Sequence, residues 1–146
     1  MQRLYTVGYE GSDIDTFLEN VKKHEVKLIV DVREKPISRK KGFSKNTLKA
    51  ALNNIGIEYI HIPELGSPKE IRDRLHETWD YFEFFQQYRL YITSELDSIM
   101  GILDRLEATP SCLMCFEHDP KTCHRSILAE YIEMYSNDID RIEDIS

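Results

Sequence analysis

The densest group of reactive side chains in this chain is the segment Cys115-Phe-Glu-His-Asp-Pro-Lys-Thr-Cys-His-Arg125, which holds two thiols, two imidazoles, two carboxylates and an arginine. An apolar run, Ser111–Cys115, precedes it, and an amphipathic run, Ser126–Tyr135, follows it. This order predicts a strand, a polar loop and then a helix. The mixture of side chains favours an active or binding site over a plain connecting loop.

Both cysteines of this segment are candidate nucleophiles. Cys123 is predicted to lie at the start of the helix, where the helix dipole and free N–H groups favour a thiolate. Cys115 ends the strand, and Glu117 beside it is a candidate proton donor or acceptor. His124 and Arg125 would supply positive charge, a proton or contacts to a bound anion.

The spacing of these residues leaves other interpretations open. Protein-tyrosine-phosphatase-like and rhodanese-like enzymes use a related plan, but nine residues separate Cys115 from Arg125 and one separates Cys123 from it, which fits neither. In a structural interpretation Cys115 is buried, Cys123 belongs to a helix cap and Cys112 lies in the core. Zinc binding is a third interpretation. Seven residues lie between the two cysteines, unlike the spacing in a zinc finger or ribbon, but four ligands are available in Cys115, Cys123, His124 and His61.

Short β-branched or aromatic runs alternate with longer amphipathic ones along the chain. The predicted strands are Leu4–Gly8, Val26–Val32, Ile57–Ile62 and Pro110–Phe116. The predicted helices cover Ile14–His24 after a Ser12 N-cap, a stretch from Ser44 to Asn54, two or three helices between Ser67 and Glu107, and a last helix from about Thr122.

This alternation predicts an α/β fold in which residues 1–146 form a single domain. We expect a three-layer αβα arrangement with a mainly parallel sheet of about four strands. The acidic tail from Asn137 onward is predicted to fray.

Ligands bind beyond the carboxyl ends of the strands in open parallel sheets. Every predicted strand here ends in polar or ionisable groups, whereas the opposite ends are bland. The groups at the carboxyl ends are Gly8, Tyr9, Glu10 and Gly11, then Asp31 and Arg33, then His61, then the segment 115–125. The sequence therefore predicts one shared site at this edge.

The first of these exits is a tight turn into a helix N-terminus. Gly8, Tyr9 and Gly11 would bind an anion there through backbone N–H groups. Glu10 would then be a general base or a metal partner. The alternative is a turn that needs only the backbone freedom of glycine.

Asp31 and Arg33 point to the same face of their strand. They form either a structural ion pair or a site in which Arg33 binds a phosphate or carboxylate and Asp31 orients it or moves protons. His61 is either a structural residue or a further proton carrier.

A basic loop follows the second strand in an otherwise acidic chain. Arg39-Lys-Lys-Gly42, with Lys45 and Lys49 after it, is the main concentration of positive charge. It is either a solvated loop or a surface that binds phosphate or a nucleic-acid backbone, with Ser38 and Arg39 as the candidate ligands. The aromatic stripe at Tyr81, Phe84, Tyr88 and Tyr91 favours core packing, with a wall that stacks a flat ligand as the alternative.

The composition is that of a globular protein, with 41% hydrophobic and 31% charged residues. The net charge of −7 argues against a strongly basic nucleic-acid coat, and no apolar run is long enough to span a bilayer. Three cysteines and no signal-peptide profile predict a cytoplasmic protein with free thiols. We expect an anionic small molecule or a nucleic acid as partner, no membrane and no resident cofactor.

The chain also resembles domain-of-unknown-function family 488 (DUF488), nearly from end to end. The motifs that carry the resemblance are Thr6-Val-Gly-Tyr-Glu-Gly11, Asp31-Val-Arg33 with Pro36, Ser38, Arg39 and Gly42-Phe-Ser44, His61-Ile-Pro-Glu-Leu-Gly66, and Cys115-Phe-Glu-x-Asp-Pro-x-x-Cys-His-Arg125. The resemblance implies a small cytoplasmic α/β protein with a polar site, and it supplies no reaction.

Three hypotheses follow. In the first, the protein is an enzyme, a cysteine-dependent hydrolase or transferase, acting on a phosphate-bearing nucleotide or nucleic acid. Arg33, Arg39 and Arg125 would bind the anion, Cys123 or Cys115 would be the nucleophile, and the proton carriers would be Glu10, Asp31, His61 or Glu117. The second is a non-catalytic nucleotide- or nucleic-acid-binding module. The third is a structural metal site.

Overall fold

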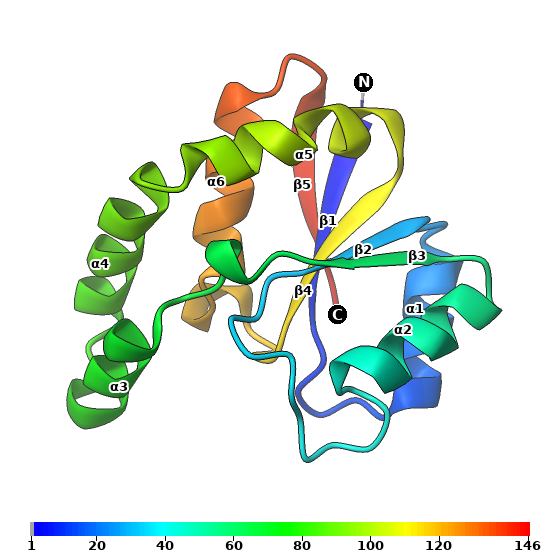
Figure 1. The fold of residues 1–146 in the computed structure, drawn as a ribbon, viewed down its shortest axis with the longest axis horizontal. Coiled ribbons are helices and arrows are strands. Elements are labelled where there is room, and N and C mark those ends of the chain that lie inside the picture. The colour runs from blue at the N-terminus through cyan, green and yellow to red at the C-terminus, as the bar shows by residue number, and fades with distance from the viewer. Residues whose placement is uncertain (1) are drawn as a thin grey trace.

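Five strands form one sheet at the centre of the computed structural model, which describes residues 2–146 (Figure 1). All neighbouring strands are parallel, in the order β3-β2-β4-β1-β5. The strands are β1 (Gln2–Gly8), β2 (Leu28–Asp31), β3 (Glu58–His61), β4 (Ser111–Cys115) and β5 (Ile139–Ile145). The predicted α/β class and parallel sheet are confirmed.

Six helices connect these strands. They are α1 (Ile14–Lys23), α2 (Lys45–Asn54), α3 (Lys69–Thr78), α4 (Tyr81–Thr93), α5 (Leu96–Ala108) and α6 (Arg125–Tyr135), with short 3-10 turns at Pro63–Leu65 and Pro120–Thr122. The N-cap of α2 is Ser44, as expected from the sequence. The N-cap of α1 is Asp13, whose carboxylate accepts a hydrogen bond from Thr16 N, and not Ser12 as expected.

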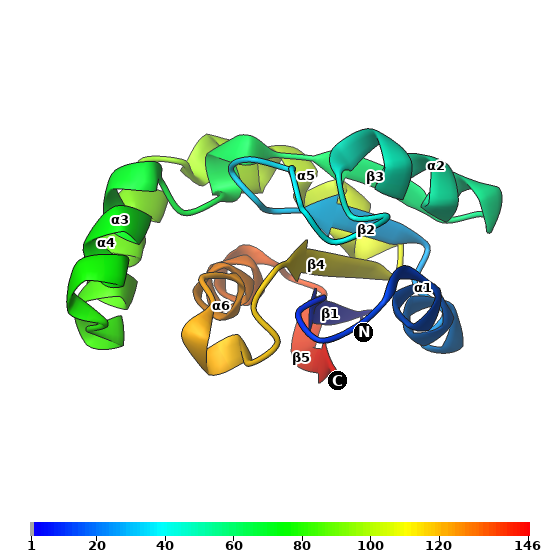
Figure 2. The same cartoon turned by 90° about the horizontal axis from the view of Figure 1, so that it is seen from below.

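Two apolar clusters fix the three layers. On one face of the sheet, Phe17 of α1 and Leu48 of α2 pack against Ile29 and Met114. On the other face, apolar side chains of α4, α5 and α6 pack against the intervening strand residues, such as Leu113. Figure 2 shows α1 and α2 on one side of the strands and α6 on the other. The central strands β2 and β4 are buried on both faces, as their continuous apolar runs indicate.

The tail is the main departure from the sequence-based expectation. It does not fray: Ile139–Ile145 form β5, which pairs in parallel with β1 along the edge of the sheet. Ile139 and Ile145 are buried, Asp140 and Arg141 are exposed, and the three residues from Ile142 to Asp144 are partly buried. An edge strand tolerates charge because one side of it meets solvent, and the acidic residues hid the strand pattern.

The segment between β3 and β4 holds three helices, within the range expected. α3 and α4 run side by side, away from the sheet (Figure 1). The aromatic stripe of α4 is part of the core at Phe84 and Tyr88, and the Tyr88 hydroxyl donates to Leu65 O. Tyr91 is only partly buried, and its hydroxyl donates to Glu64 O.

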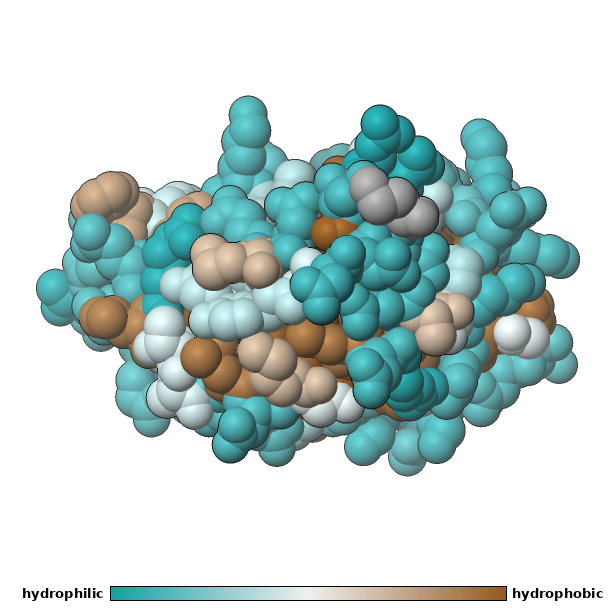
Figure 3. All heavy atoms as spheres, turned by 90° about the horizontal axis from the view of Figure 1, so that it is seen from above, coloured by the Kyte–Doolittle hydropathy of each residue, from teal (hydrophilic) through white to brown (hydrophobic). Residues whose placement is uncertain are grey.

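None of the helices in residues 2–146 combines the length and the apolar character needed to cross a bilayer. Figure 3 shows the side of the molecule near the start of β1, where hydrophilic side chains surround a smaller apolar band.

Candidate functional site

A cavity of about 360 Å³ opens beyond the carboxyl ends of the strands. Its walls come from segments that are distant in the sequence: Tyr9 after β1, the loop 33–39 after β2, Ser67 and Arg72 near the start of α3, and residues 115–117 after β4. Seven of the side chains predicted for the site line it: Tyr9, Arg33, Ser38, Arg39, Cys115, Glu117 and His124.

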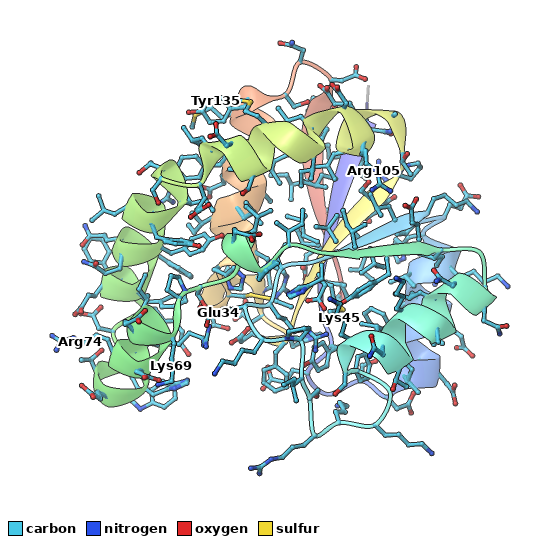
Figure 4. All side chains as sticks on the ribbon, in the orientation of Figure 1. Glu34, Lys45, Lys69, Arg74, Arg105 and Tyr135 are labelled. Atoms are coloured by element: carbon cyan, nitrogen blue, oxygen red, sulfur yellow. A yellow bond between two sulfur atoms is a disulfide. The ribbon has the colours of Figure 1, made fainter. Side chains whose placement is uncertain are left out.

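Sequence reasoning missed six further lining residues, namely Glu34, Lys35, Ile37, Ser67, Arg72 and Phe116. Four of them lie in the same two loops as predicted site residues, so their closeness in the sequence to those residues could have identified them. Ser67 and Arg72 had no such signal, because only the tertiary fold brings α3 to the pocket. Figure 4 shows Glu34 between the sheet and α3, and Lys45 at the start of α2.

Arg33 and Asp31 form a buried ion pair at the end of β2. The Arg33 guanidinium donates to both Asp31 carboxylate oxygens, at 2.9 and 2.7 Å, and its backbone N–H donates to Oδ1 at 3.1 Å. Tyr59 donates its hydroxyl to the same carboxylate. Burial opposes the charge on Arg33, but Asp31 reverses that effect and the net pKa of Arg33 is raised. Burial and Asp31 together raise the pKa of Tyr59.

These contacts leave little of the pair free for other work. Arg33 also donates to the Tyr9 hydroxyl at 3.1 Å and to Phe43 O at 2.8 Å. One of its five guanidinium N–H groups then has no partner among residues 2–146. Arg33 lines the cavity, and this N–H is the part of its guanidinium that remains unpaired there.

Arg125 is completely buried, at 0% exposure, behind the cavity wall. Its guanidinium donates to Cys115 Sγ at 3.2 Å, to the carbonyl oxygens of Glu117 and His118, and to Asp144 Oδ1 at 3.0 Å. With Nε–H also on Asp144, every guanidinium N–H is used. The side chain therefore holds the β4–α6 loop in place and puts a positive charge beside Cys115.

Gly8 must be a glycine because of this arrangement. A Cβ atom at position 8 would overlap the carbonyl oxygen of Glu117 and lie 2.9 Å from Nη1 of Arg125. The backbone of Gly8 therefore forms the surface on which the β4–α6 loop rests.

Cys115 and Cys123 are joined in a disulfide, which corrects the expectation that all three thiols are free. The expectation holds for Cys112, which is a free, buried cysteine. The spacing of eight residues is local, but the pairing depends on the turn at Pro120–Thr122, which folds the loop back on β4. A nucleophilic role for either residue of the pair requires the reduced form.

The two cysteines differ in what surrounds them. Cys115 lines the cavity, and its sulfur lies 3.8 Å from Glu117 Oε2. The sequence predicts Cys123 at the start of the last helix, but α6 begins at Arg125 with His124 as its N-cap, so Cys123 lies just before the helix. The Cys123 sulfur lies 3.8 Å from His124 Nδ1. Burial raises the pKa of the Glu117 carboxyl, which favours its protonated form as a proton donor.

His124 is neutral at pH 7. Burial lowers its pKa to about 4, and its Nε2 bonds to Val32 O at 2.8 Å. A carbonyl is an acceptor, so Nε2 carries the proton and Nδ1 carries the lone pair that faces Cys123. The sequence-based suggestion that His124 carries a positive charge is therefore not supported. The positive charge around the cavity comes from its arginines and its lysine.

The remaining predicted residues lie outside the lining. The Glu10 carboxylate accepts from His118 N at 3.0 Å and ties the β1 exit to the β4–α6 loop. Gly11 has a φ of +80° in the exposed turn before α1. His61 Nε2 bonds to Arg33 O at 2.7 Å, which fixes the start of the loop after β2.

The loop after β2 is closed on itself by two serines. Ser44 Oγ accepts from Ser38 N at 3.0 Å and donates to Ser38 O at 3.2 Å, and Ser38 Oγ accepts from Lys40 N. This leaves Arg39 exposed at the rim of the cavity. On the opposite rim, Arg72 pairs with Glu34 at 2.9 Å and donates to Ser67 O.

Residues 13–132 match the family described as "Domain of unknown function DUF488". The chain belongs to this family. The DUF488 match covers the loops after β2 and β4, and hence both rims of the cavity, while Gly8 to Gly11 lie before its first residue. Searches of the curated proteins and of the solved structures found no match.

One group of side chains in this DUF488 domain has the geometry to hold a metal ion. Sulfur atoms of Cys115 and Cys123 and a carboxylate oxygen of Glu117 lie within 4.8 Å of one another, and the two sulfurs could act as ligands only after the disulfide is reduced. His124, proposed from the sequence as a further ligand, points Nδ1 at Cys123 and donates its other ring nitrogen to a carbonyl, which is the usual arrangement of a metal-bound histidine. His61 instead bonds to Arg33 O, so it is committed elsewhere.

Proposed function

We propose that this DUF488 protein is an enzyme that binds a phosphate-bearing substrate in the cavity, with Cys115 as its nucleophile. The observation that carries the proposal is the composition of the cavity wall. Four cationic side chains, Arg33, Lys35, Arg39 and Arg72, face two carboxylates, Glu34 and Glu117. This excess of positive charge is found in a chain with a net charge of −7.

The cationic side chains of the cavity differ in their exposure to solvent. Arg33 is fixed by Asp31 and offers one N–H, so it would orient a bound phosphate. Arg39 and Lys35 are exposed and would close over the anion from the rim. A cavity of about 360 Å³ is within the usual range for small-molecule sites, about 300–1,000 Å³.

The reaction that fits these groups is phosphoryl transfer through the reduced Cys115. The thiolate attacks phosphorus and forms an S–P bond while the P–O bond to the leaving group breaks, and Glu117 gives its proton to the leaving oxygen. Water then attacks phosphorus, Glu117 takes its proton, and the S–P bond breaks to release phosphate and the thiolate. The position of Glu117, 3.8 Å from the Cys115 sulfur, supports this division of roles.

Binding and turnover are tested separately. Calorimetric titration of the reduced protein with inorganic phosphate should show binding that Arg39→Ala and Lys35→Ala each weaken by about tenfold. Lys49→Ala, an exposed lysine of α2 outside the cavity, is the matched control and should bind normally. Equal binding by all three variants would refute the site.

Turnover is measured with p-nitrophenyl phosphate and with nucleoside monophosphates. Cys115→Ser should lose turnover and keep phosphate binding, whereas Cys112→Ser should keep both. Turnover that survives in Cys115→Ser would exclude that residue as the nucleophile.

A second function, non-catalytic binding of a nucleic acid, is favoured by the surface around the cavity. The exposed basic residue Arg39 lines the cavity together with two exposed apolar residues, Ile37 at 77% and Phe116 at 43% exposure. Stacking on an aromatic ring together with backbone charge is how single strands are bound without sequence preference. Binding of an oligonucleotide should then weaken with salt, with a log–log slope that falls by about 0.7 in Arg39→Ala, and without turnover.

A third function, structural metal binding, is favoured by the Cys115, Glu117 and Cys123 group. Zinc at one equivalent in elemental analysis of the reduced protein would support it, and zinc below a tenth of an equivalent would exclude it.

A further inference from the structure

Cys115 and Cys123 differ in their position relative to the cavity, and phosphate binding does not require this difference. Both cysteines are buried at 1% exposure, but Cys115 lines the cavity and Cys123 does not, and the two sulfurs are within bonding reach. Cys112 lies on the same strand as Cys115, but it packs in the cluster on the opposite face of the sheet. The Cys115 thiol therefore borders the cavity, the Cys123 thiol lies next to it away from the cavity, and the Cys112 thiol is isolated from both.

The charges around Cys115 favour its reactive form. Arg125 donates an N–H to the Cys115 sulfur at 3.2 Å, and the charge of a guanidinium stabilises a thiolate over a thiol. Arg125 carries no exposed surface and all its N–H groups are used, so this charge is fixed in place. Glu117, 3.8 Å from the same sulfur, can supply a proton to a leaving oxygen.

Cys123 has the surroundings of a second thiol that acts later. Nδ1 of His124 carries a lone pair that faces the Cys123 sulfur at 3.8 Å. The Val32 carbonyl fixes the orientation of the ring through Nε2. The Cys123 thiol is therefore held next to Cys115 without direct access to the cavity, which it does not line.

We propose that Cys115 is a site of oxidation by hydroperoxides and that Cys123 converts the product into a reversible disulfide. The Cys115 thiolate attacks one peroxide oxygen, so that an S–O bond forms, the O–O bond breaks and the alcohol or water leaves with a proton from Glu117. The Cys123 sulfur then attacks the Cys115 sulfenic acid, so that the S–S bond forms and the S–O bond breaks. The hydroxide leaves with the thiol proton of Cys123 as water. Two electrons pass from the two thiols to one hydroperoxide, and a dithiol reductant returns them.

Oxidation would stop turnover in the cavity and leave its phosphate-binding side chains in place. The disulfide occupies the Cys115 sulfur, while Lys35, Arg39 and Arg72 stay on the rim. The oxidised protein should therefore keep phosphate binding and lose turnover. This consequence rests on the proposed function, whereas the oxidation itself depends only on the thiols.

The test begins with the fully reduced full-length chain and one equivalent of hydrogen peroxide. Thiol titration should fall from three to one, the intact mass should fall by two hydrogen atoms, and peptide mapping should identify a Cys115–Cys123 crosslink that dithiothreitol reverses. Three surviving thiols, or a crosslink that includes Cys112, would overturn the proposal.

Single variants separate the two roles. Cys123→Ser should stop at a Cys115 sulfenic acid that dimedone traps, and Cys115→Ser should react with peroxide about tenfold or more slowly. Cys112→Ser is the matched control and should form the crosslink at the wild-type rate. If a serine variant fails to fold, the crosslink mapped in the wild-type chain still decides. Stoichiometric zinc that blocks peroxide oxidation in the reduced protein would overturn the proposal in favour of a metal site. Failure of phosphate binding, with the crosslink present, would instead refute the proposed function alone.

Discussion

Replacing Asp31 with asparagine should destabilise the protein severely. The carboxylate has no exposed surface, and it accepts three hydrogen bonds from Arg33 and one from Tyr59. Asparagine keeps a single acceptor oxygen and turns an NH₂ group toward donors. Arg33 is then left charged and buried without its counter-ion.

Breaking a buried ion pair by removing one partner costs about 3–5 kcal/mol, out of the roughly 5–15 kcal/mol that stabilise a typical domain. For a urea m-value of about 2 kcal/mol/M, the unfolding midpoint should fall by about 2 M. Urea unfolding followed by circular dichroism measures this directly.

Asp73→Asn provides the matched control. It is the same chemical change in an ion pair, to Lys69 at 2.6 Å, but both partners are exposed on α3. Its midpoint should not change measurably, because solvent screens exposed pairs. If Asp31→Asn unfolds at the same urea concentration as Asp73→Asn, the Asp31–Arg33 pair does not stabilise the loop as its burial implies.

Three further predictions concern the same framework. Gly8→Ala should destabilise by about 1–3 kcal/mol or more, since its Cβ overlaps Glu117 O, whereas Gly101→Ala, with open space around it in α5, should be neutral or stabilising in thermal unfolding. The lowered pKa of His124, about 4 against 6.5 unfolded, means that stability falls as pH drops from about 6.5 to about 4, by about 3 kcal/mol. Urea unfolding across that window should show a smaller loss in His124→Gln, and an equal loss would contradict the assignment. Asp144→Asn should cost at most about 3 kcal/mol because Arg125 loses its carboxylate, and differential scanning calorimetry would detect the lower Tm.

The fold was largely predictable from the sequence. Apolar strands buried on both faces and amphipathic helices repeat in a regular order, and local periodicity records both. β5 was not predictable in the same way, because an edge strand with Ile139 and Ile145 buried among acidic residues carries little periodic signal. Its strand character depends on pairing with β1, which is a tertiary contact.

The site was predictable in location but not in the state of its side chains. The sequence predicts Cys115 and Arg33 as site residues because they lie at the carboxyl ends of parallel strands, which meet at one edge of the sheet. The commitment of Arg125 to Asp144, 19 residues away, and the arrival of Arg72 from α3 follow from the folded chain alone. The Cys115–Cys123 bond likewise depends on how the loop turns, and that turn decides whether the thiols are free.

The contact between Arg125 and Asp144 sets the minimum length of a fragment that keeps the surroundings of Cys115 intact. The residues matched by the family end at 132 and begin at 13, so a fragment cut to them would lack β1 and β5. Its sheet would end at the bare edge of β4, and the guanidinium beside Cys115 would be buried without a carboxylate. Expression fragments should therefore extend through Ile145. The last strand does not line the cavity, but its Asp144 carboxylate pairs with the Arg125 guanidinium beside Cys115.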